Sequence, residues 1–350
     1  MFESGARSLA YRRPPHSSSS NQNYKKPYFS KEGYHSRTMA LRGVAQRFGS
    51  TSSHSPALNL KGISIALTTP FDSEQRIDFD KLKHNLNIYE KIPLTAYVAA
   101  GTNGEAPFLT PDERVQVVKF VRENTDKSKM VIGGATAEST RLCAEMTTAM
   151  SKVGADGVLV MPPFYFKRKM TEEAIRTHYT TVAETSGLPI VIYNNIWVTG
   201  MDISTSELAK LAQHPLIRGV KDADIRKCAA TAQETKSLNF DVLCGSAGYL
   251  LPSLLNGCSG GIMGLTAILG QELCDLYSAY QEGKFEKAQE IQARVIKPDI
   301  LILAELGPPG LKSAMDMMGY FGGHCRKPIL PTSEKDKLRI TEVLRAAGYL

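Results

Sequence analysis

Short apolar runs alternate with longer amphipathic segments along most of the chain after residue 60. The runs are rich in β-branched residues, which is typical of strands buried on both faces, and the amphipathic segments between them are typical of helices. We predict strands at 62–67, 94–99, 130–133, 157–161, 189–193, 217–221, 241–244 and 260–262. The helices predicted between them include 78–89, 111–123, 139–153, 172–184 and 205–212.

Eight strands with intervening helices predict an α/β fold, a (β/α)8 or TIM barrel with additional C-terminal helices. A doubly wound sheet is the alternative, but such a sheet usually has fewer strands. We expect the barrel to occupy 59–283 and a helical extension to occupy 284–350. Helices are predicted there at 270–281, 284–305, 310–318 and 333–346, with Leu311, Met315 and Met318 forming an apolar stripe that indicates core or subunit interface.

Residues 1–58 differ from the rest in composition. Four serines stand at 17–20, and residues 1–60 hold nine Lys or Arg against two acidic residues, so their net charge is +7. Within this leader, 39–48 is amphipathic, with Leu41, Val44 and Phe48 on one helical face. An acid-poor segment rich in Arg and Ser resembles a mitochondrial transit peptide, which predicts the mitochondrial matrix. The alternatives are a disordered tail on a cytoplasmic enzyme, or an over-extended gene model in which Met39 is the true start.

The charge of the whole chain is also +7, so the other 290 residues carry 33 basic and 33 acidic side chains and are neutral. We therefore expect no nucleic-acid partner. The six cysteines are irregularly spaced without a CxxC pair, which indicates reduced thiols. No histidines after residue 60 have metal-ligand spacing, and no apolar run approaches the length of a membrane span, so neither a metal site nor a membrane segment is expected.

The predicted strand 217–221 ends on Lys221, an unusual residue for packing alone. Burying an ammonium group is costly, and neutralising it lowers that cost. Because a neutral lysine is a nucleophile, this position predicts covalent chemistry with a carbonyl. The alternative interpretation is a surface lysine paired with Asp222 or Asp224.

A glycine turn, Gly101–Glu105 (GTNGE), follows the second predicted strand, and the segment 110–113 (TPDE) opens the next helix with a capping box. Such a turn exposes backbone N–H groups that suit a carboxylate or phosphate, although it is also compatible with a plain tight turn. Tyr193 ends the fifth predicted strand, next to the strand of Lys221 in a barrel. A tyrosine beside an amine can transfer protons, or it can be a buried structural residue.

Four motifs in this order resemble the dihydrodipicolinate synthase and N-acetylneuraminate lyase family, the Schiff-base aldolases, over about residues 60–350. They are GTNGE at 101–105, PFY at 163–165, IYN at 192–194 followed by Thr199-Gly200, and GVKD at 219–222. Within this family, the segments 245–250 and 307–328 are most similar to the mitochondrial 4-hydroxy-2-oxoglutarate aldolases.

The resemblance implies catalytic roles for three residues. Lys221 forms an imine with the keto group of pyruvate or of a 2-oxo acid, and Tyr193 transfers protons. Tyr165 completes a proton relay in a neighbouring subunit, so a homotetramer is implied. The protonated imine accepts the electrons released when the C3–C4 bond breaks, and no cofactor or metal is implied.

The resemblance also implies a pyruvate pocket. Gly101, Thr102 and Asn103 hold the pyruvyl carboxylate, partly through backbone N–H groups, and the backbone of Ile262 lines the pocket. A rival interpretation of the glycines in 257–264 is a phosphate site, which would suit a sugar-phosphate aldolase. We favour close packing and pyruvate access for these glycines.

Two positions depart from the family pattern. Val198 stands where the synthases usually have an arginine that binds the aldehyde's carboxylate, and Ala223 stands where the hydroxy-oxoglutarate aldolases have a serine. The aldolases also keep a small polar residue at the position of Val198. A charge-assisted hydrogen bond contributes ~1.5–3 kcal/mol, so the aldehyde half of the site has lost donors. The neighbouring Trp197, the only tryptophan, either reshapes that half or serves in packing.

The predicted reaction is cleavage of a 4-hydroxy-2-oxo acid, specifically 4-hydroxy-2-oxoglutarate, into pyruvate and an aldehyde such as glyoxylate. The alternatives are 4-hydroxy-tetrahydrodipicolinate (dihydrodipicolinate) synthase and a 2-keto-3-deoxy sugar-acid aldolase or dehydratase. A barrel that binds a keto acid without catalysis is the alternative from another class.

Overall fold

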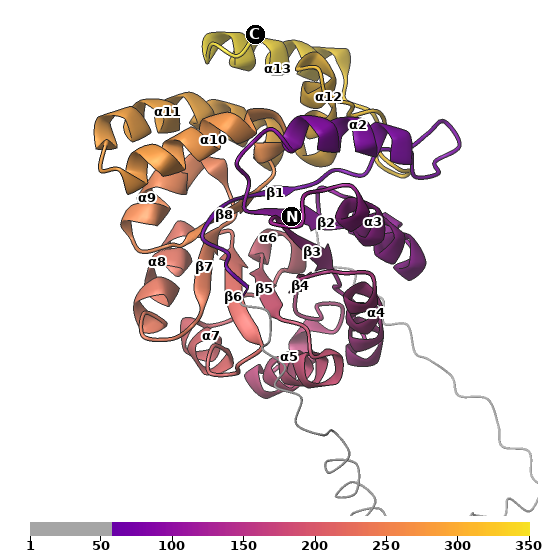
Figure 1. The fold of residues 1–350 in the computed structure, drawn as a ribbon, viewed down its shortest axis with the longest axis vertical. Coiled ribbons are helices and arrows are strands. Elements are labelled where there is room, and N and C mark those ends of the chain that lie inside the picture. Colours follow the sequence, from indigo (N-terminus) through magenta and orange to yellow (C-terminus); the bar gives the residue numbers. More distant parts are fainter. Residues whose placement is uncertain (1–57) are drawn as a thin grey trace, which may run out of the picture. The chain divides into compact units, whose positions relative to one another are not determined.

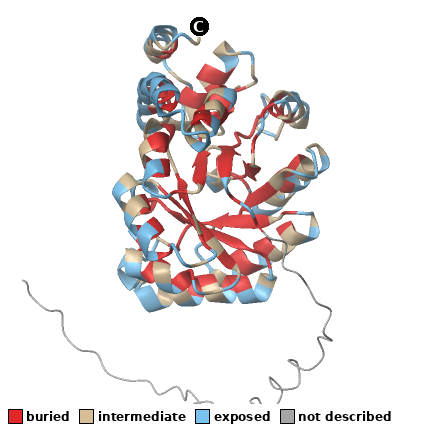
Figure 2. Ribbon diagram, turned by 60° about the vertical axis from the view of Figure 1, so that its left-hand side comes forward, coloured by how far each residue is buried: buried red, intermediate tan, exposed pale blue. Residues whose placement is uncertain are grey.

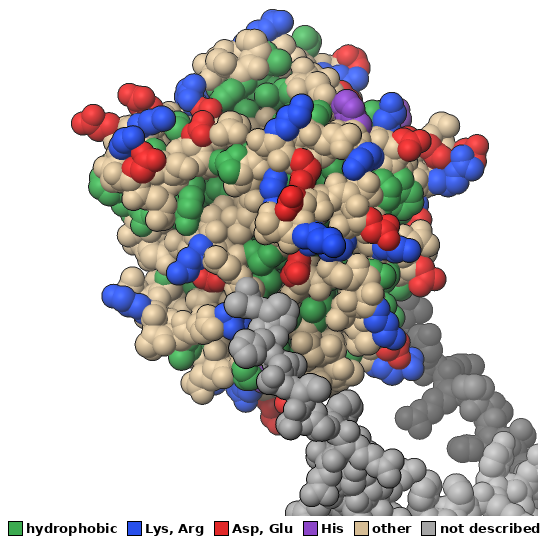
Figure 3. Space-filling view, viewed as in Figure 1, with side chains coloured by type: hydrophobic (Ala, Val, Ile, Leu, Met, Phe, Trp, Pro, Cys, Tyr) green, Lys and Arg blue, Asp and Glu red, His purple; other side chains and the backbone are tan. Residues whose placement is uncertain are grey.

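A computed structural model describes residues 58–350. The predicted leader falls, apart from Leu58, outside the described residues. No helix in the described part is both long and apolar enough to cross a membrane. On the face shown in Figure 3, acidic and basic side chains are interspersed, in keeping with the balanced charge of this part of the chain.

Eight parallel strands close into a barrel in which each strand pairs with the next and β8 pairs with β1 (Figure 1). The predicted barrel is therefore confirmed. The strands are β1 (Gly62–Ala66), β2 (Ala96–Ala99), β3 (Met130–Gly134), β4 (Gly157–Val160), β5 (Ile190–Asn194), β6 (Ile217–Asp222), β7 (Asp241–Cys244) and β8 (Gly260–Met263).

Helices follow the strands and surround the barrel, so the strands are buried while the outer helix faces are exposed (Figure 2). They are α2 (Phe79–Tyr89), α3 (Pro111–Glu123), α4 (Thr140–Lys152), α5 (Glu172–Ser186), α7 (Thr205–Leu211), α8 (Ile225–Glu234) and α9 (Leu250–Leu255). The predicted capping box of α3 is present: Thr110 Oγ1 accepts from Glu113 N at 3.2 Å, and Thr110 N donates to Glu113 Oε2 at 2.8 Å.

The barrel interior is a separate apolar layer whose members come from the strands and adjoining loops, not from helices. It includes Val98, Val191, Tyr193 and Ile262. Val220 instead packs in the layer between strands and helices. Because side chains alternate along a strand, its neighbour Lys221 points into the barrel.

The C-terminal part is helical, as predicted, with one difference. The elements are α10 (Thr266–Gln281), α11 (Phe285–Pro298), the π-helical segment η5 (Asp299–Glu305), α12 (Gly307–Met317) and α13 (Glu334–Ala346). The single helix predicted over 284–305 is wrong, because α11 ends at Pro298 and the backbone continues with π-helical bonding. The apolar stripe prediction is confirmed as core for Leu311 and Met315, which are fully buried.

A buried ion pair joins this C-terminal part to the turn after β2. Lys312 on α12 is fully buried, and its Nζ lies 2.6 Å from Glu105 Oε1. The same Nζ donates to the carbonyl oxygens of Thr69 at 2.8 Å and His324 at 2.9 Å. Glu105 Oε2 accepts from Arg326 N at 2.7 Å, and Glu105 itself has a φ of 58°, which is rare for a residue other than glycine. The pair therefore holds the turn in an unfavourable backbone conformation.

Substituting Lys312→Met should strongly destabilise the fold. The change leaves the Glu105 carboxylate buried without its cation, which typically costs about 3–5 kcal/mol. Unfolding in denaturant should show this loss of free energy, and the double variant Lys312→Met, Glu105→Gln should recover part of it. A single variant as stable as the unsubstituted protein would contradict the assignment.

Candidate active site

A cavity of about 530 Å³ opens at the carboxyl ends of β2 to β5. Thr102 after β2, Thr136 after β3, Phe164 after β4 and Tyr193 at the end of β5 contribute to its wall. Catalytic groups of (β/α)8 enzymes lie at this end of the barrel, because the loops that follow the strands meet there. Gly134 allows the close packing of its floor, since a Cβ at this position would collide with the Ala100 carbonyl oxygen.

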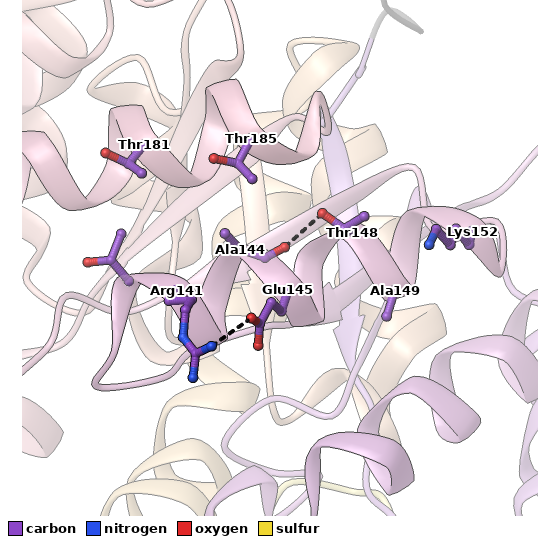
Figure 4. Close-up of a pocket in the computed structure, with 9 residues that line it drawn as sticks. Arg141, Ala144, Glu145, Thr148, Ala149, Lys152, Thr181 and Thr185 are labelled. Carbon is purple, nitrogen blue, oxygen red and sulfur yellow. Dashed lines mark hydrogen bonds and ion pairs between the residues drawn. The ribbon is translucent and has the colours of Figure 1, made fainter. Parts of the chain in front are cut away.

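A larger groove of about 650 Å³ lies elsewhere, between α4 and α5 on the outside of the barrel (Figure 4). Its charged side chains include Arg141 and Glu145, which form an ion pair of 3.5 Å one helical turn apart. Threonines from both helices supply most of its other polar groups, and no residue from a strand end lines it. We therefore place the active site in the smaller cavity at the strand ends.

Lys221 is buried at the end of β6, with 5% of its surface exposed. Its Nζ lies 4.2 Å from the centroid of the Tyr193 ring, and the two residues are paired directly across β5 and β6. No carboxylate of residues 58–350 lies within 4.0 Å of this ammonium group. The two neighbouring carboxylates have other partners, since Asp222 bonds to Asn194 and Asp224 pairs with Arg226. The interpretation as a paired surface lysine is therefore wrong.

The Tyr193 hydroxyl has a lowered pKa. Burial alone would raise this pKa, but the positive charge of Lys221 and hydrogen bonding from Asn195, Thr102 and Lys221 together outweigh burial. Asn195 Nδ2 donates to the hydroxyl at 2.9 Å, whereas the buried Thr102 hydroxyl is close by without a well-aligned partner. The arrangement stabilises the tyrosinate, so Tyr193 can accept and return a proton more readily than an ordinary tyrosine.

The turn after β2 presents unused backbone donors. Its shape is fixed by bonds from Glu105 N to Thr102 O at 3.0 Å and from Ala106 N to Gly101 O at 3.1 Å. The N–H groups of Thr102 and Asn103 donate to no other group in the described part of the chain. Two neighbouring free N–H groups suit a carboxylate oxygen.

Ile262 and Asn103 both lie near the carboxyl end of β8 and are not among the residues that line the cavity. Ile262 is fully buried in β8, where it pairs with Ser64 of β1 in the interior layer. Asn103 packs against Gly264 just beyond β8, and a Cβ on Gly264 would collide with its side-chain amide. The structure thus brings Lys221 and Tyr193 together and sets the predicted carboxylate turn against the end of β8, while the chemical roles of these residues stay predictions.

Among the predicted site residues, Gly101, Thr102 and Tyr193 line the cavity, whereas Lys221, Asn103 and Ile262 do not. Tyr165 does not line it either. It is 74% exposed in the loop after β4, and its ring packs edge-on against Phe166 at a centroid distance of 5.0 Å. Its N–H donates to Glu138 Oε2 at 2.8 Å. Of the two departures from the family pattern, Val198 lines the cavity and Ala223 does not. The neighbouring Trp197 is highly exposed and also lies outside the lining.

The sequence analysis did not predict several side-chain contacts next to Tyr193 and Lys221. Asn195 caps the one-turn helix α6 (Ile196–Thr199), and its side chain also holds the Tyr193 hydroxyl. The sequence indicated a helix cap at this position, but it did not specify the direction of the side-chain amide.

Asp222 follows Lys221 and is held by Asn194 Nδ2 at 2.7 Å and Asp224 N at 2.9 Å. Its burial raises the carboxyl pKa to about 6. Among residues 58–350, no three His, Cys, Asp or Glu side chains gather to hold a metal ion.

Comparisons with known proteins agree with this architecture. A model described as the dihydrodipicolinate synthetase family matches residues 59–347. The chain is 33% identical over 293 residues to the 4-hydroxy-tetrahydrodipicolinate synthase of Gluconacetobacter diazotrophicus, covering 83% of this chain and 98% of that protein. It is 32% identical over 288 residues to the protein of the same name from Geobacter metallireducens, covering 81% and 98%.

Solved structures are also similar over most of the chain. The dihydrodipicolinate synthase of Bacillus anthracis superposes with a TM-score of 0.78 at 29% identity, covering 83% of this chain and 99% of that one. The chloride-inhibited dihydrodipicolinate synthase of Acinetobacter baumannii, solved with pyruvate, gives a TM-score of 0.79 at 27% identity and covers 83% and 100%.

Substituting Asp222→Asn should remove a pH dependence of stability. The folded-state pKa of about 6 lies above the ordinary 3.8, so the folded protein binds this proton more tightly than the unfolded chain. The stability contributed by the protonated carboxyl is full below pH 3.8 and is lost as pH rises through 6. The unfolding free energy of the variant relative to the unsubstituted protein should therefore rise by roughly 2–3 kcal/mol between pH 4 and pH 7. Denaturant titrations at the two pH values measure this difference, and an unchanged difference would show that Asp222 does not titrate there.

Proposed function

The chain belongs to the dihydrodipicolinate synthetase family of class I aldolases, and from this premise we propose that Lys221 forms an imine with the keto carbon of pyruvate or of a larger 2-oxo acid. The observation that carries the proposal is the buried Lys221 ammonium, which has the Tyr193 ring 4.2 Å away and no carboxylate partner in the described residues. Membership in a family of enzymes argues against the keto-acid-binding barrel without catalysis.

The neutral amine of Lys221 attacks the keto carbon, and water leaves to give the protonated imine. In the cleavage direction, a base removes the proton of the 4-hydroxyl group, the C3–C4 bond breaks and an aldehyde departs. The electron pair of that bond moves into the imine to form an enamine, which is protonated at C3 and then hydrolysed to free pyruvate and the amine. Tyr193 is placed to carry these protons, because its hydroxyl has a lowered pKa next to Lys221.

The free N–H groups of Thr102 and Asn103 support a role in binding the pyruvyl carboxylate, and Gly101 lines the same cavity. The resemblance implies that the Ile262 backbone completes the pocket. Holding this carboxylate fixes the keto carbon relative to the amine, and such positioning lowers the barrier to bond formation. Since both products and substrates share the pyruvyl half, this pocket serves either direction of the reaction.

We propose that Tyr165 acts in the site of a second copy of the chain within a homotetramer. Tyr165 and Phe166 are both highly exposed and lie side by side on the loop after β4. Exposed neighbouring aromatic rings are unusual on the surface of a monomer and are typical of interfaces. The phenol of Tyr165 would then extend the proton path that begins at Tyr193.

For the aldehyde half we propose, first, cleavage of a 4-hydroxy-2-oxo acid, with 4-hydroxy-2-oxoglutarate as the candidate. Val198 supports this choice, because it leaves the cavity without the arginine that the synthases use. The second candidate is 4-hydroxy-tetrahydrodipicolinate synthase, and the names of the similar proteins favour it over the first. A coupled assay with lactate dehydrogenase separates the two, since the first releases pyruvate from 4-hydroxy-2-oxoglutarate and the second consumes pyruvate with an aldehyde.

Substituting Lys221→Arg should abolish turnover. A guanidinium stays charged and cannot form the imine, so kcat should fall by at least about 10³-fold while the protein stays folded. Lys227→Arg is the matched control, because Lys227 lies on α8 and pairs with Asp202 at 2.7 Å outside the cavity. Full activity of the Lys221 variant in the pyruvate assay would rule out the proposed mechanism.

We propose that the leader, residues 1–58, directs the protein to the mitochondrial matrix, with the cytoplasm as the alternative. Its excess of basic residues and its amphipathic segment at 39–48 support this. A fluorescent reporter fused behind residues 1–60 should enter mitochondria, and replacing Arg42 and Arg47 by glutamine should reduce import. A reporter that remains diffuse in the cytosol would refute the proposal.

A further inference from the structure

Arg114 is the one basic side chain among the described residues that line the active-site cavity, and the mechanism above does not use it. It lies in the first half of α3, which begins nine residues after the Thr102 turn. Thr102 and Tyr193 line the same cavity, so a ligand there can contact the Thr102 turn, the Tyr193 side chain and the guanidinium. Lys221 is not among the lining residues, but its Nζ lies 4.2 Å from the Tyr193 ring. Most of the remaining wall is apolar, which strengthens any charge interaction made there.

The guanidinium of Arg114 has unused hydrogen-bonding capacity. Of the five N–H donors that an arginine carries, Nη1 donates to the Thr136 carbonyl at 2.8 Å, while the buried Nε has no partner. Arg122, farther along the same helix, provides the contrast: it pairs with Asp156 at 3.3 Å and donates to several carbonyl oxygens. Arg114 forms no ion pair with any carboxylate of residues 58–350.

The acidic residue in the cavity wall does not neutralise Arg114. Glu138 Oε2 accepts from Phe164 N at 3.0 Å and from Tyr165 N at 2.8 Å, so this carboxylate holds the loop after β4. It lies beyond ion-pair distance of the guanidinium. Burial lowers the pKa of Arg114, in keeping with the absence of a carboxylate partner among the described residues. A half-buried guanidinium without a carboxylate partner, in an accessible cavity, favours an anionic ligand.

Resting on the proposed function, we propose that Arg114 binds a carboxylate on the aldehyde half of the substrate, so that the enzyme prefers substrates with two carboxylates. The pyruvyl carboxylate lies on the Thr102 turn, and the second carboxylate lies at the α3 side of the cavity. Arg114 thereby supplies from a helix the charge that Val198 does not supply from the loop after β5. Sugar acids, whose aldehyde half is uncharged, are disfavoured by the same reasoning.

The test compares two substrates that differ only at the second carboxylate. 4-Hydroxy-2-oxoglutarate carries it, and 4-hydroxy-2-oxopentanoate has a methyl group in its place. In Arg114→Leu, kcat/KM for the dicarboxylate should fall about 10- to 100-fold, the loss expected for one charge-assisted contact. The value for the methyl compound should change by less than about twofold. Arg114→Lys should retain part of the preference, because it keeps the charge without the planar pair of donors.

The matched control is Arg141→Leu, because Arg141 is an exposed arginine of the neighbouring helix α4 that pairs with Glu145 away from this cavity. This control should leave both substrates unaffected. The same comparison is made in the condensing direction with glyoxylate and acetaldehyde, by following pyruvate consumption. Pyruvate binding, measured by calorimetry, should be unchanged in Arg114→Leu.

Equal losses on both substrates, or no loss on either, would overturn the role of Arg114 while leaving the proposed function in place. Selective loss confined to the dicarboxylate, together with normal pyruvate binding and normal thermal unfolding, supports it. If the unsubstituted protein neither binds pyruvate nor turns over any of the four compounds, the proposed function itself fails, and the assignment of Arg114 to substrate fails with it.

Discussion

The structure depends on one costly placement, a lysine ammonium buried at the end of a barrel strand without a carboxylate partner. The alternation of side chains along β6 sends Lys221 inward, because Val220 packs outward against the helices. The face of the Tyr193 ring offsets part of the cost through a cation–π contact, which is worth more in a dry site than at the surface. The same closeness lowers the pKa of the Tyr193 hydroxyl, in keeping with the proton-transfer role proposed for this residue.

A second buried lysine, Lys312, has a purely structural role, and its ammonium group has a carboxylate partner. Lys312 Nζ has a carboxylate oxygen at 2.6 Å and donates to two carbonyl oxygens. Its task is to hold Glu105, and through it the turn that presents the N–H groups of Thr102 and Asn103. The C-terminal helices therefore do more than cover the barrel, because they fix the loop on which the proposed carboxylate site depends.

Much of the fold followed from the pattern of apolar positions, since parallel barrel strands are nearly continuous apolar runs separated by amphipathic helices. The positions of Lys221 and Tyr193 at neighbouring strand ends were also predictable from this pattern, whereas their chemical roles were implied only by the family resemblance. The pairing of Glu105 with Lys312 was not predictable, because the two residues lie far apart in the sequence. The only indication was that Lys312 is a charged residue inside an apolar stripe. The end of α11 at Pro298 had a visible signal, since proline disrupts helical bonding, but the π-helical continuation did not. Arg114 and Asn195 depend on side-chain direction, which a sequence pattern does not specify.

The central claim is that Lys221 is the residue that condenses with a carbonyl. The most direct measurement is to incubate the protein with pyruvate and borohydride, digest it and locate the modified peptide by mass spectrometry. The account predicts one reduced pyruvyl group per chain, carried by the Lys221 side chain and absent when pyruvate or borohydride is omitted. A correctly folded protein that gains no adduct, or gains it on another lysine, would contradict the account.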